Sequence, residues 1–257
     1  DIHGNLLIRQ RMQVVRALME EEELAVVTSI DGCMDFLESL EQIREQLLYF
    51  TSDSTVDIDA LKARLVWLGY ERVGQVELPG QFSIRGGIVD IYCLTEENPW
   101  RIELWGDEID SIRSFDAESQ RSLENLEEIT IYPAVEHPGE MAKLSFLDYF
   151  PAQKSVVFLD EPNRLVEKGQ AVEEEYRQSR LHRAEKGENN LPENWLCSFE
   201  KVQKELNKRN CIALCALEPR QAGWKINEKF YIEAKSVNSY NSSFELLTKD
   251  LEQYKRQ

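Results

Sequence analysis

Residues 80–93, GQFSIRGGIVDIYC, and residues 100–116, WRIELWGDEIDSIRSFD, decide the fold of this chain. In both stretches apolar residues alternate with polar ones, as Val89 and Ile91 do around Asp90. A period of two that is rich in β-branched and aromatic residues is typical of half-buried strands rather than of helix. Glycines at positions 86, 87 and 106 interrupt the alternation and indicate turns or close backbone approaches. The two stretches therefore predict a small antiparallel β unit.

The alternation places one large aromatic residue on the polar face of this unit. If Ile102 and Leu104 face the core, then Arg101, Glu103 and Trp105 point to the opposite side. Two interpretations of Trp105 are open. It packs beneath a neighbouring helix or loop, or it belongs to a binding patch, because exposed Trp and Arg are enriched at energetic hot spots.

Composition bounds the functions that this chain can carry. Its 257 residues suffice for about two domains, and a hydrophobic content of 42% is enough for ordinary cores. With 30 Lys and Arg against 47 Asp and Glu, the net charge is −17. Neutralising phosphates requires clustered basic residues, so we expect little direct nucleic-acid binding. An acidic surface suits solubility or a basic protein partner.

The cysteines and the absence of long apolar runs indicate a compartment. The five cysteines form no CxxC pair, and reduced thiols in apolar surroundings are the expectation. No apolar run approaches the roughly 18 residues of a membrane span, and no signal peptide is apparent. We therefore expect a cytoplasmic protein without membrane contact. The first residue, Asp1, and the charged end suggest a piece of a longer protein.

The flanks of the β unit have an α/β pattern. Helical spacing at residues 6–22 and 31–40 encloses an apolar run, LAVVTS at 24–29, that is typical of a buried parallel strand. A helix at 58–70, capped by Asp57 or Asp59 and ended by Gly69, precedes the β unit. Further predicted elements follow it: a helix at 146–150, an apolar strand at 155–162, a helix at 163–186, a loop at 187–194, a helix at 202–208, a buried strand at 211–217 and a helix at 242–254. We predict an α/β domain formed by residues 1–50 and 136–257, with an α+β module at 51–135 inserted into it.

One predicted apolar strand ends in two acidic residues, a pattern that also occurs in nucleotide-binding sites. SVVFLDEP at 155–162 looks like a magnesium-binding Walker B element. None of the twelve glycines is followed by Lys, so the phosphate-binding loop that such a site needs is missing. Asp160 and Glu161 are therefore expected to cap the following helix. The acidic run at 107–110 is interpreted as turn chemistry, and the three histidines lack metal-ligand spacing, so no catalytic, cofactor or metal site is predicted.

Four stretches carry a family resemblance: PGQFSIRGGIVDIY at 79–92, RIELWGDEIDSIRSFD at 101–116, SQRSLE at 119–124 and IYPAVE at 131–136. In order and spacing they resemble the N-terminal, UvrB-homologous region of bacterial transcription-repair coupling factors, the Mfd family. UvrB itself is the nearest rival, but it is expected to carry a Walker A loop and an RGD-type turn. This chain has Arg85-Gly86-Gly87 instead, which favours the Mfd family.

The resemblance implies a fold and a site. The fold is a degenerate RecA-like α/β domain, split in sequence and without nucleotide-binding motifs, with an inserted module like domain 2 of UvrB and Mfd. In the family this module binds UvrA through an arginine before the Gly-Gly turn, an arginine that opens the next strand and an aromatic residue four positions later. These positions match Arg85, Arg101 and Trp105, although the aromatic is commonly Phe.

The resemblance also implies a role. We expect a binding module, not an enzyme, that recruits UvrA to lesion-stalled RNA polymerase in nucleotide excision repair. The ATP- and magnesium-dependent DNA translocase motor and the sites for RNA polymerase and DNA belong to other parts of the parent protein. Two alternatives stay open: a fragment of a UvrB-type repair helicase, and a structural domain that masks other surfaces of the parent and inhibits it.

Overall fold

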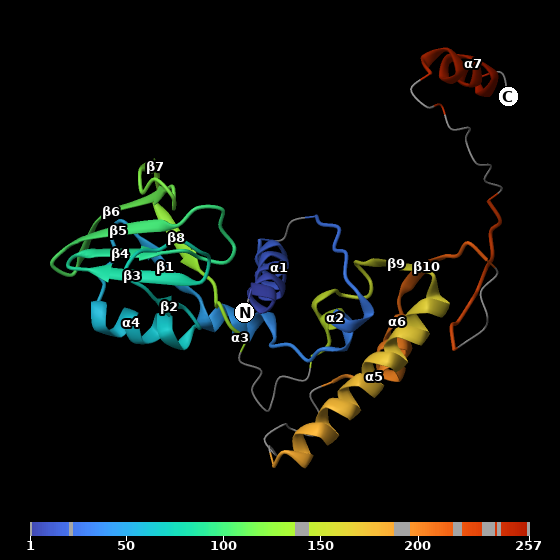
Figure 1. The fold of residues 1–257 in the computed structure, drawn as a ribbon, viewed down its shortest axis with the longest axis horizontal. Helices are drawn as coiled ribbons and strands as arrows, with labels where there is room; N and C mark the ends of the chain where they lie inside the picture. Colours follow the sequence, from blue (N-terminus) through green and yellow to red (C-terminus); the bar gives the residue numbers. More distant parts are fainter. Residues whose placement is uncertain are drawn as a thin grey trace. The chain divides into compact units, whose positions relative to one another are not determined.

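A computed structural model describes residues 2–20, 23–136, 144–187, 196–217, 223–232, 240 and 243–255 (Figure 1). The chain divides into two units, residues 1–224 and residues 225–257, and each is described by itself. The loop predicted at 187–194 lies outside the described residues apart from Gly187.

The first unit is centred on a six-stranded sheet with the order β2-β3-β4-β5-β6-β7. All neighbouring strands run antiparallel except β2 and β3, which are parallel. The strands are β2 (Glu71–Arg72), β3 (Gln81–Arg85), β4 (Ile88–Ile91), β5 (Trp100–Trp105), β6 (Glu108–Phe115) and β7 (Ser122–Asn125). The predicted antiparallel β unit is therefore confirmed.

A second pair of strands joins the two ends of this module. β1 (Leu48–Thr51) pairs antiparallel with β8 (Glu128–Ile131), so that Leu48 lies opposite Ile131. No strand was predicted at these residues. The strand forms because Leu48 and Phe50 pack against the core, while the exposed Tyr49 faces outward.

Helix α4 (Ile58–Trp67) lies across one face of the sheet (Figure 1). The Asp57 side chain accepts hydrogen bonds of 3.0 Å from the backbone N–H groups of Asp59 and Ala60, which confirms the predicted N-cap. Gly69 follows the helix with φ +88°, the left-handed conformation of a C-terminal glycine. The side of α4 that carries Leu61 and Leu65 is buried.

The core of the module lies between this helix and the inward face of the sheet. The side chains facing inward are almost completely buried: Phe82, Val89, Ile91, Ile102 and Ile112. Each occupies an apolar position of the alternating pattern, so the pattern and the core agree.

The N-terminal segment is mainly helical. α1 (Ile2–Met19) confirms the first predicted helix and buries Met12 and Val15. The predicted helix at 31–40 is instead α2 (Ile30–Met34) and the start of α3 (Leu40–Gln46). Between them, Asp35 and Leu37 form isolated β-bridges to Leu196 and Leu144. A capping box, in which the side chains of Ser39 and Gln42 bond each other's backbone N–H, begins α3 and so separates the two helices.

The buried strand predicted at 24–29 is wrong. These residues are irregular, and Val27 is 98% exposed. A buried strand requires a neighbouring strand for its backbone hydrogen bonds, and no described strand pairs with this run. Apolar composition alone therefore did not make these residues a strand, because they have no described strand to pair with.

The C-terminal part of the first unit contains the second α/β element. Its members are the 3₁₀ helix η1 (Phe146–Tyr149), β9 (Val156–Asp160), α5 (Pro162–Glu185), α6 (Phe199–Leu206) and β10 (Asn210–Leu214). β9 and β10 form a parallel pair. β10 was predicted to be buried, yet every one of its residues is exposed, and among the described residues no third strand pairs with its other edge. The α/β class is confirmed, whereas the RecA-like arrangement and the division at residues 50 and 135 remain predictions.

The second unit contains the predicted closing helix. α7 (Phe244–Tyr254) begins at Ser243, whose hydroxyl accepts a hydrogen bond from the backbone N–H of Leu246. The residues before it, 225–232, carry no helix or strand.

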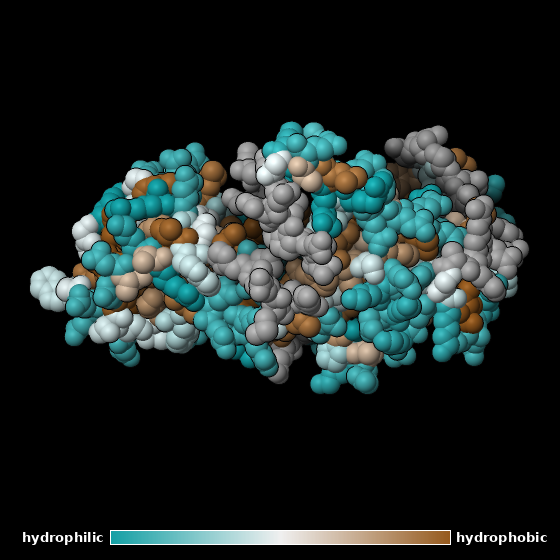
Figure 2. Space-filling view, turned by 90° about the horizontal axis from the view of Figure 1, so that it is seen from below, coloured by the Kyte–Doolittle hydropathy of each residue, from teal (hydrophilic) through white to brown (hydrophobic). Residues whose placement is uncertain are grey.

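The face in Figure 2 carries hydrophilic side chains with apolar ones between them. Within the described ranges no helix is long and apolar enough to cross a membrane. Cys33, Cys93 and Cys197 are buried free thiols, as expected. Cys211 and Cys215 are exposed, which corrects the expectation of apolar surroundings for them, because their segment lies on the exposed strand β10 or just after it.

Candidate protein-binding site

The polar face of the sheet consists of two rows of side chains that cross strands β3 to β6. The pairing register aligns the residues of each row on four neighbouring strands. The first row contains Ser83, Asp90, Arg101 and Arg113. The second row contains Arg85, Ile88, Glu103 and Ser111. Two of the three residues implied by the resemblance thus lie in adjacent rows of one face.

Asp90 is the centre of this face and is completely buried. Arg101 donates from Nε to Asp90 Oδ1 at 2.7 Å and from Nη2 to Oδ2 at 2.9 Å. Arg85 donates from Nη2 to Asp90 Oδ2 at 2.7 Å. A buried carboxylate is tolerated only when it is paired and hydrogen-bonded, and the two arginines meet this requirement together.

Arg101 is held on several sides. Its guanidinium lies 4.4 Å from the centre of the Phe115 ring, and Nη2 also donates to Gln120 Oε1 at 3.1 Å. Only 14% of its side chain is exposed. The hydrogen bonds to Asp90 raise the pKa of Arg101, which favours its charged form. Arg101 is therefore part of the framework of the face as well as part of its surface.

Arg85 and Trp105 are the accessible members. The Arg85 side chain is 48% exposed although it is bound to Asp90, and Trp105 is 82% exposed. A β-bulge explains the position of Trp105. Glu103 lies opposite Ser111 and Leu104 opposite Ile109, so Asp110 is an extra residue in β6 beside the end of β5.

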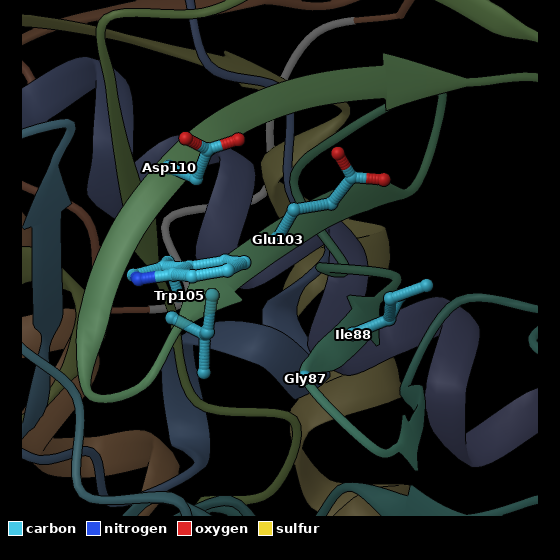
Figure 3. A pocket seen from close by; sticks show the side chains of 6 residues that line it. Gly87, Ile88, Glu103, Trp105 and Asp110 are labelled. Atoms are coloured by element: carbon cyan, nitrogen blue, oxygen red, sulfur yellow. The ribbon is translucent and has the colours of Figure 1, made fainter.

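A shallow, open hollow of about 360 Å³ lies beside the Trp105 indole (Figure 3). It is lined by Gly87, Ile88, Glu103, Leu104, Trp105 and Asp110. Gly87 permits the close approach of its strand, because a Cβ there would lie 2.9 Å from the carbonyl oxygen of Leu104. The hollow is therefore formed where β4 and the β5–β6 hairpin meet.

The three predicted residues have different positions. Arg85 and Arg101 are brought together by Asp90, whereas Trp105 lies at the end of β5. No hydrogen bond or ring contact among the described residues connects Trp105 to either arginine. The interpretation that packs Trp105 beneath a neighbouring element is wrong, since its ring is mostly in solvent. The binding role of the three residues remains a prediction.

Sequence reasoning missed three supporting residues: Asp90, Phe115 and Gln120. A signal for Asp90 was present, because it is a charged residue between Val89 and Ile91 in a central strand. A two-residue turn at Gly86-Gly87 would have aligned Asp90 with Ser83. Gln120 gave no signal, because its contact depends on a left-handed backbone with φ +60°.

Glu161, at the end of the Walker B-like strand, has a structural role. Glu161 occupies the N-cap of α5 with φ +49°, but its side chain makes no bond to the helix, so the predicted capping is wrong. Its Oε1 instead accepts a hydrogen bond from the backbone N–H of Ala216 at 2.8 Å, which holds the ends of β9 and β10 together. No group of three or more possible metal ligands occurs among the described side chains.

Comparisons with known proteins find a family match over the residues that form the sheet. The model of the UvrB interaction domain family matches residues 48–137, which include the whole sheet and its polar face. A transcription-repair-coupling factor of Bacillus subtilis is 44% identical over 137 residues, 52% of this chain and 12% of that protein. One of Staphylococcus aureus is 37% identical over 131 residues, 51% of this chain and 11% of that protein.

The chain therefore matches only about an eighth of the length of these relatives. The family match covers the segment of this chain that contains the six-stranded sheet. Residues 48–137 match the UvrB interaction domain family, and about half of the chain is similar to part of the bacterial transcription-repair-coupling factors.

Proposed function

We propose that this chain is the UvrA-recruiting part of a transcription-repair-coupling factor and that the face formed by Arg85, Arg101 and Trp105 is its contact surface. The observation that carries the proposal is the 82% exposure of Trp105 on a UvrB interaction domain. A large indole in solvent is costly unless a partner covers it, and Trp is the residue type most enriched at binding hot spots. In the longer protein, recruitment would occur at lesion-stalled RNA polymerase, and the ATP-dependent DNA motor would lie in other parts.

Within this surface the three residues have separate tasks. Arg85 has exposed N–H groups that can donate to carboxylate or carbonyl oxygens of UvrA. Trp105 supplies apolar area that becomes desolvated on binding. Arg101 holds Asp90, and through it Arg85, in place.

The acidic composition and the domain match favour this function over a helicase fragment. A net charge of −17 opposes contact with phosphates. The matched family is an interaction domain, and its residues include the exposed aromatic surface. A protein partner is therefore the better assignment.

The test is a titration of the 257-residue chain against UvrA by calorimetry, with the variants Trp105→Ala and Arg85→Glu. We expect each variant to weaken binding by about 30-fold, equivalent to about 2 kcal/mol. Matched controls are Trp67→Ala on α4 and Arg72→Glu on β2, which change the same residue types at exposed positions outside the polar face. If both test variants bind as tightly as the unchanged chain, the surface is wrongly assigned. If the unchanged chain does not bind UvrA, the proposed function is wrong.

A further inference from the structure

The hollow beside Trp105 combines an aromatic face with negative charge. Glu103 and Asp110 are the two carboxylates that line it, and Ile88 and Leu104 are its aliphatic side chains. Figure 3 shows Glu103 and Asp110 beside the Trp105 indole, with Ile88 on the neighbouring strand. Two more acidic residues of the same hairpin, Asp107 and Glu108, are exposed.

The two lining carboxylates are not equivalent. Glu103 accepts hydrogen bonds from Arg113 and, at 3.2 Å, from the Ser111 hydroxyl. Asp110 is exposed and, within the described part of the chain, makes no side-chain hydrogen bond or ion pair. The free negative charge of the hollow is therefore at Asp110, at the β-bulge.

The shape of the hollow favours a side chain over a small molecule. A site for a small ligand encloses most of its surface, whereas this hollow is shallow and open. A guanidinium group fits it well, because it stacks on an indole and donates hydrogen bonds to a carboxylate at the same time. Nucleic acid would bring phosphates toward four acidic side chains, which repel them.

We propose that the hollow formed by Trp105, Ile88, Glu103 and Asp110 receives an arginine side chain of the partner protein, stacked on the Trp105 ring and paired with Asp110. The assignment rests on the proposed function and gives the chemistry of the partner surface. That surface presents an arginine to the acidic β5–β6 hairpin and acceptor oxygens to Arg85, so it carries two groups of opposite polarity. Such complementary polarity sets the orientation of the complex.

The experiment measures UvrA binding of Asp110→Asn and Asp110→Lys, each in the full 257-residue chain. We expect a weakening of several-fold for Asp110→Asn and of tenfold or more for Asp110→Lys, because the latter places like charges together. Glu124→Lys on β7 is the matched control, since it makes the same charge change at an exposed position away from the hollow. It is expected to change the affinity less than twofold.

A charge exchange identifies the arginine itself. Surface arginines of UvrA are replaced one at a time by Glu. One of these UvrA variants should bind the unchanged chain poorly, and its affinity for Asp110→Lys should be at least tenfold higher than its affinity for the unchanged chain. Unchanged affinity of Asp110→Lys, together with weakened binding of Trp105→Ala, would overturn the arginine assignment and leave the proposed function intact. An equal effect of Glu124→Lys would also overturn it, because long-range charge would then explain the result. No binding by the unchanged chain would contradict the proposed function first.

Discussion

Arg101 and Asp90 form a bidentate ion pair on the polar face of the sheet, with Nε 2.7 Å from Oδ1 and Nη2 2.9 Å from Oδ2. The carboxylate is completely buried, and the arginine side chain is only 14% exposed. The pair connects two central strands, β4 and β5, at directly opposed positions. The same carboxylate holds Arg85, so Asp90 connects the framework of the sheet to the proposed contact surface.

Replacing Asp90 tests this framework. Asp90→Asn keeps the shape of the side chain and removes the charge, which leaves the mostly buried Arg101 without its counter-ion. We expect the free energy of unfolding to fall by about 3 kcal/mol, as for the loss of one partner of a buried ion pair. Urea unfolding followed by circular dichroism measures it. Asp110→Asn removes an exposed carboxylate and should change the free energy of unfolding by less than about 0.5 kcal/mol.

The two arginines should separate stability from binding. Arg85→Ala removes a half-exposed side chain with one ion pair, so we expect a loss of at most about 1 kcal/mol in the free energy of unfolding. Arg101→Ala removes the bidentate pair and the contact with Phe115, and about 3 kcal/mol should be lost. Urea unfolding of both variants checks the difference. Equal losses would mean that the carboxylate does not depend mainly on Arg101.

This difference also decides which variant is informative about UvrA. A weakened interaction of Arg101→Ala reports on folding as well as contact, whereas that of Arg85→Ala reports mainly on contact. Binding experiments on the polar face should therefore rely on Arg85 and Trp105.

The sequence predicted the module well because several local signals agree there. Alternation, β-branched residues and turn glycines all favour the same strands, and Asp57 and Gly69 mark both ends of α4. Residues 24–29 had only apolar composition and no partner strand, and their prediction was wrong. β9 and β10 were correctly predicted as strands, but the predicted burial of β10 was wrong, because burial depends on neighbouring elements that a local pattern does not specify.

The candidate site was predictable in part for the same reason. The period of two placed Arg101 and Trp105 on one face, and the structure leaves Trp105 in solvent. The role of Asp90 depends on the register of three strands, and that of Gln120 on a left-handed loop residue. The bulge at Asp110 shifts the hairpin by one residue, which no alternating pattern specifies.

A glycine in the long helix α5 should be sensitive to a single methyl group. A Cβ at Gly169 would lie 2.2 Å from the Phe199 ring of α6, which explains a helix-disfavouring residue in the middle of a helix. We expect Gly169→Ala to lower the free energy of unfolding by about 1–3 kcal/mol, despite the better helix propensity of Ala. Gly74→Ala is the matched control, because a Cβ there meets no atom within 4 Å. A stabilised Gly169→Ala variant would show that α5 and α6 do not pack this closely.

Alkaline pH should destabilise the chain through Cys33. Burial raises the pKa of its thiol from 9.0 to about 11, because desolvation disfavours the thiolate. The unfolded chain therefore loses this proton first, and the stability from the buried neutral thiol, complete below pH 9, is lost as the pH rises to 11. A shift of two pKa units corresponds to about 3 kcal/mol. Urea unfolding at pH 8, 9.5 and 11 measures the decline. Cys33→Ala should show a smaller decline over the same interval, because it lacks this thiol while Cys215 and the other titrating groups are retained. An identical decline in both proteins would assign the alkaline sensitivity to other groups.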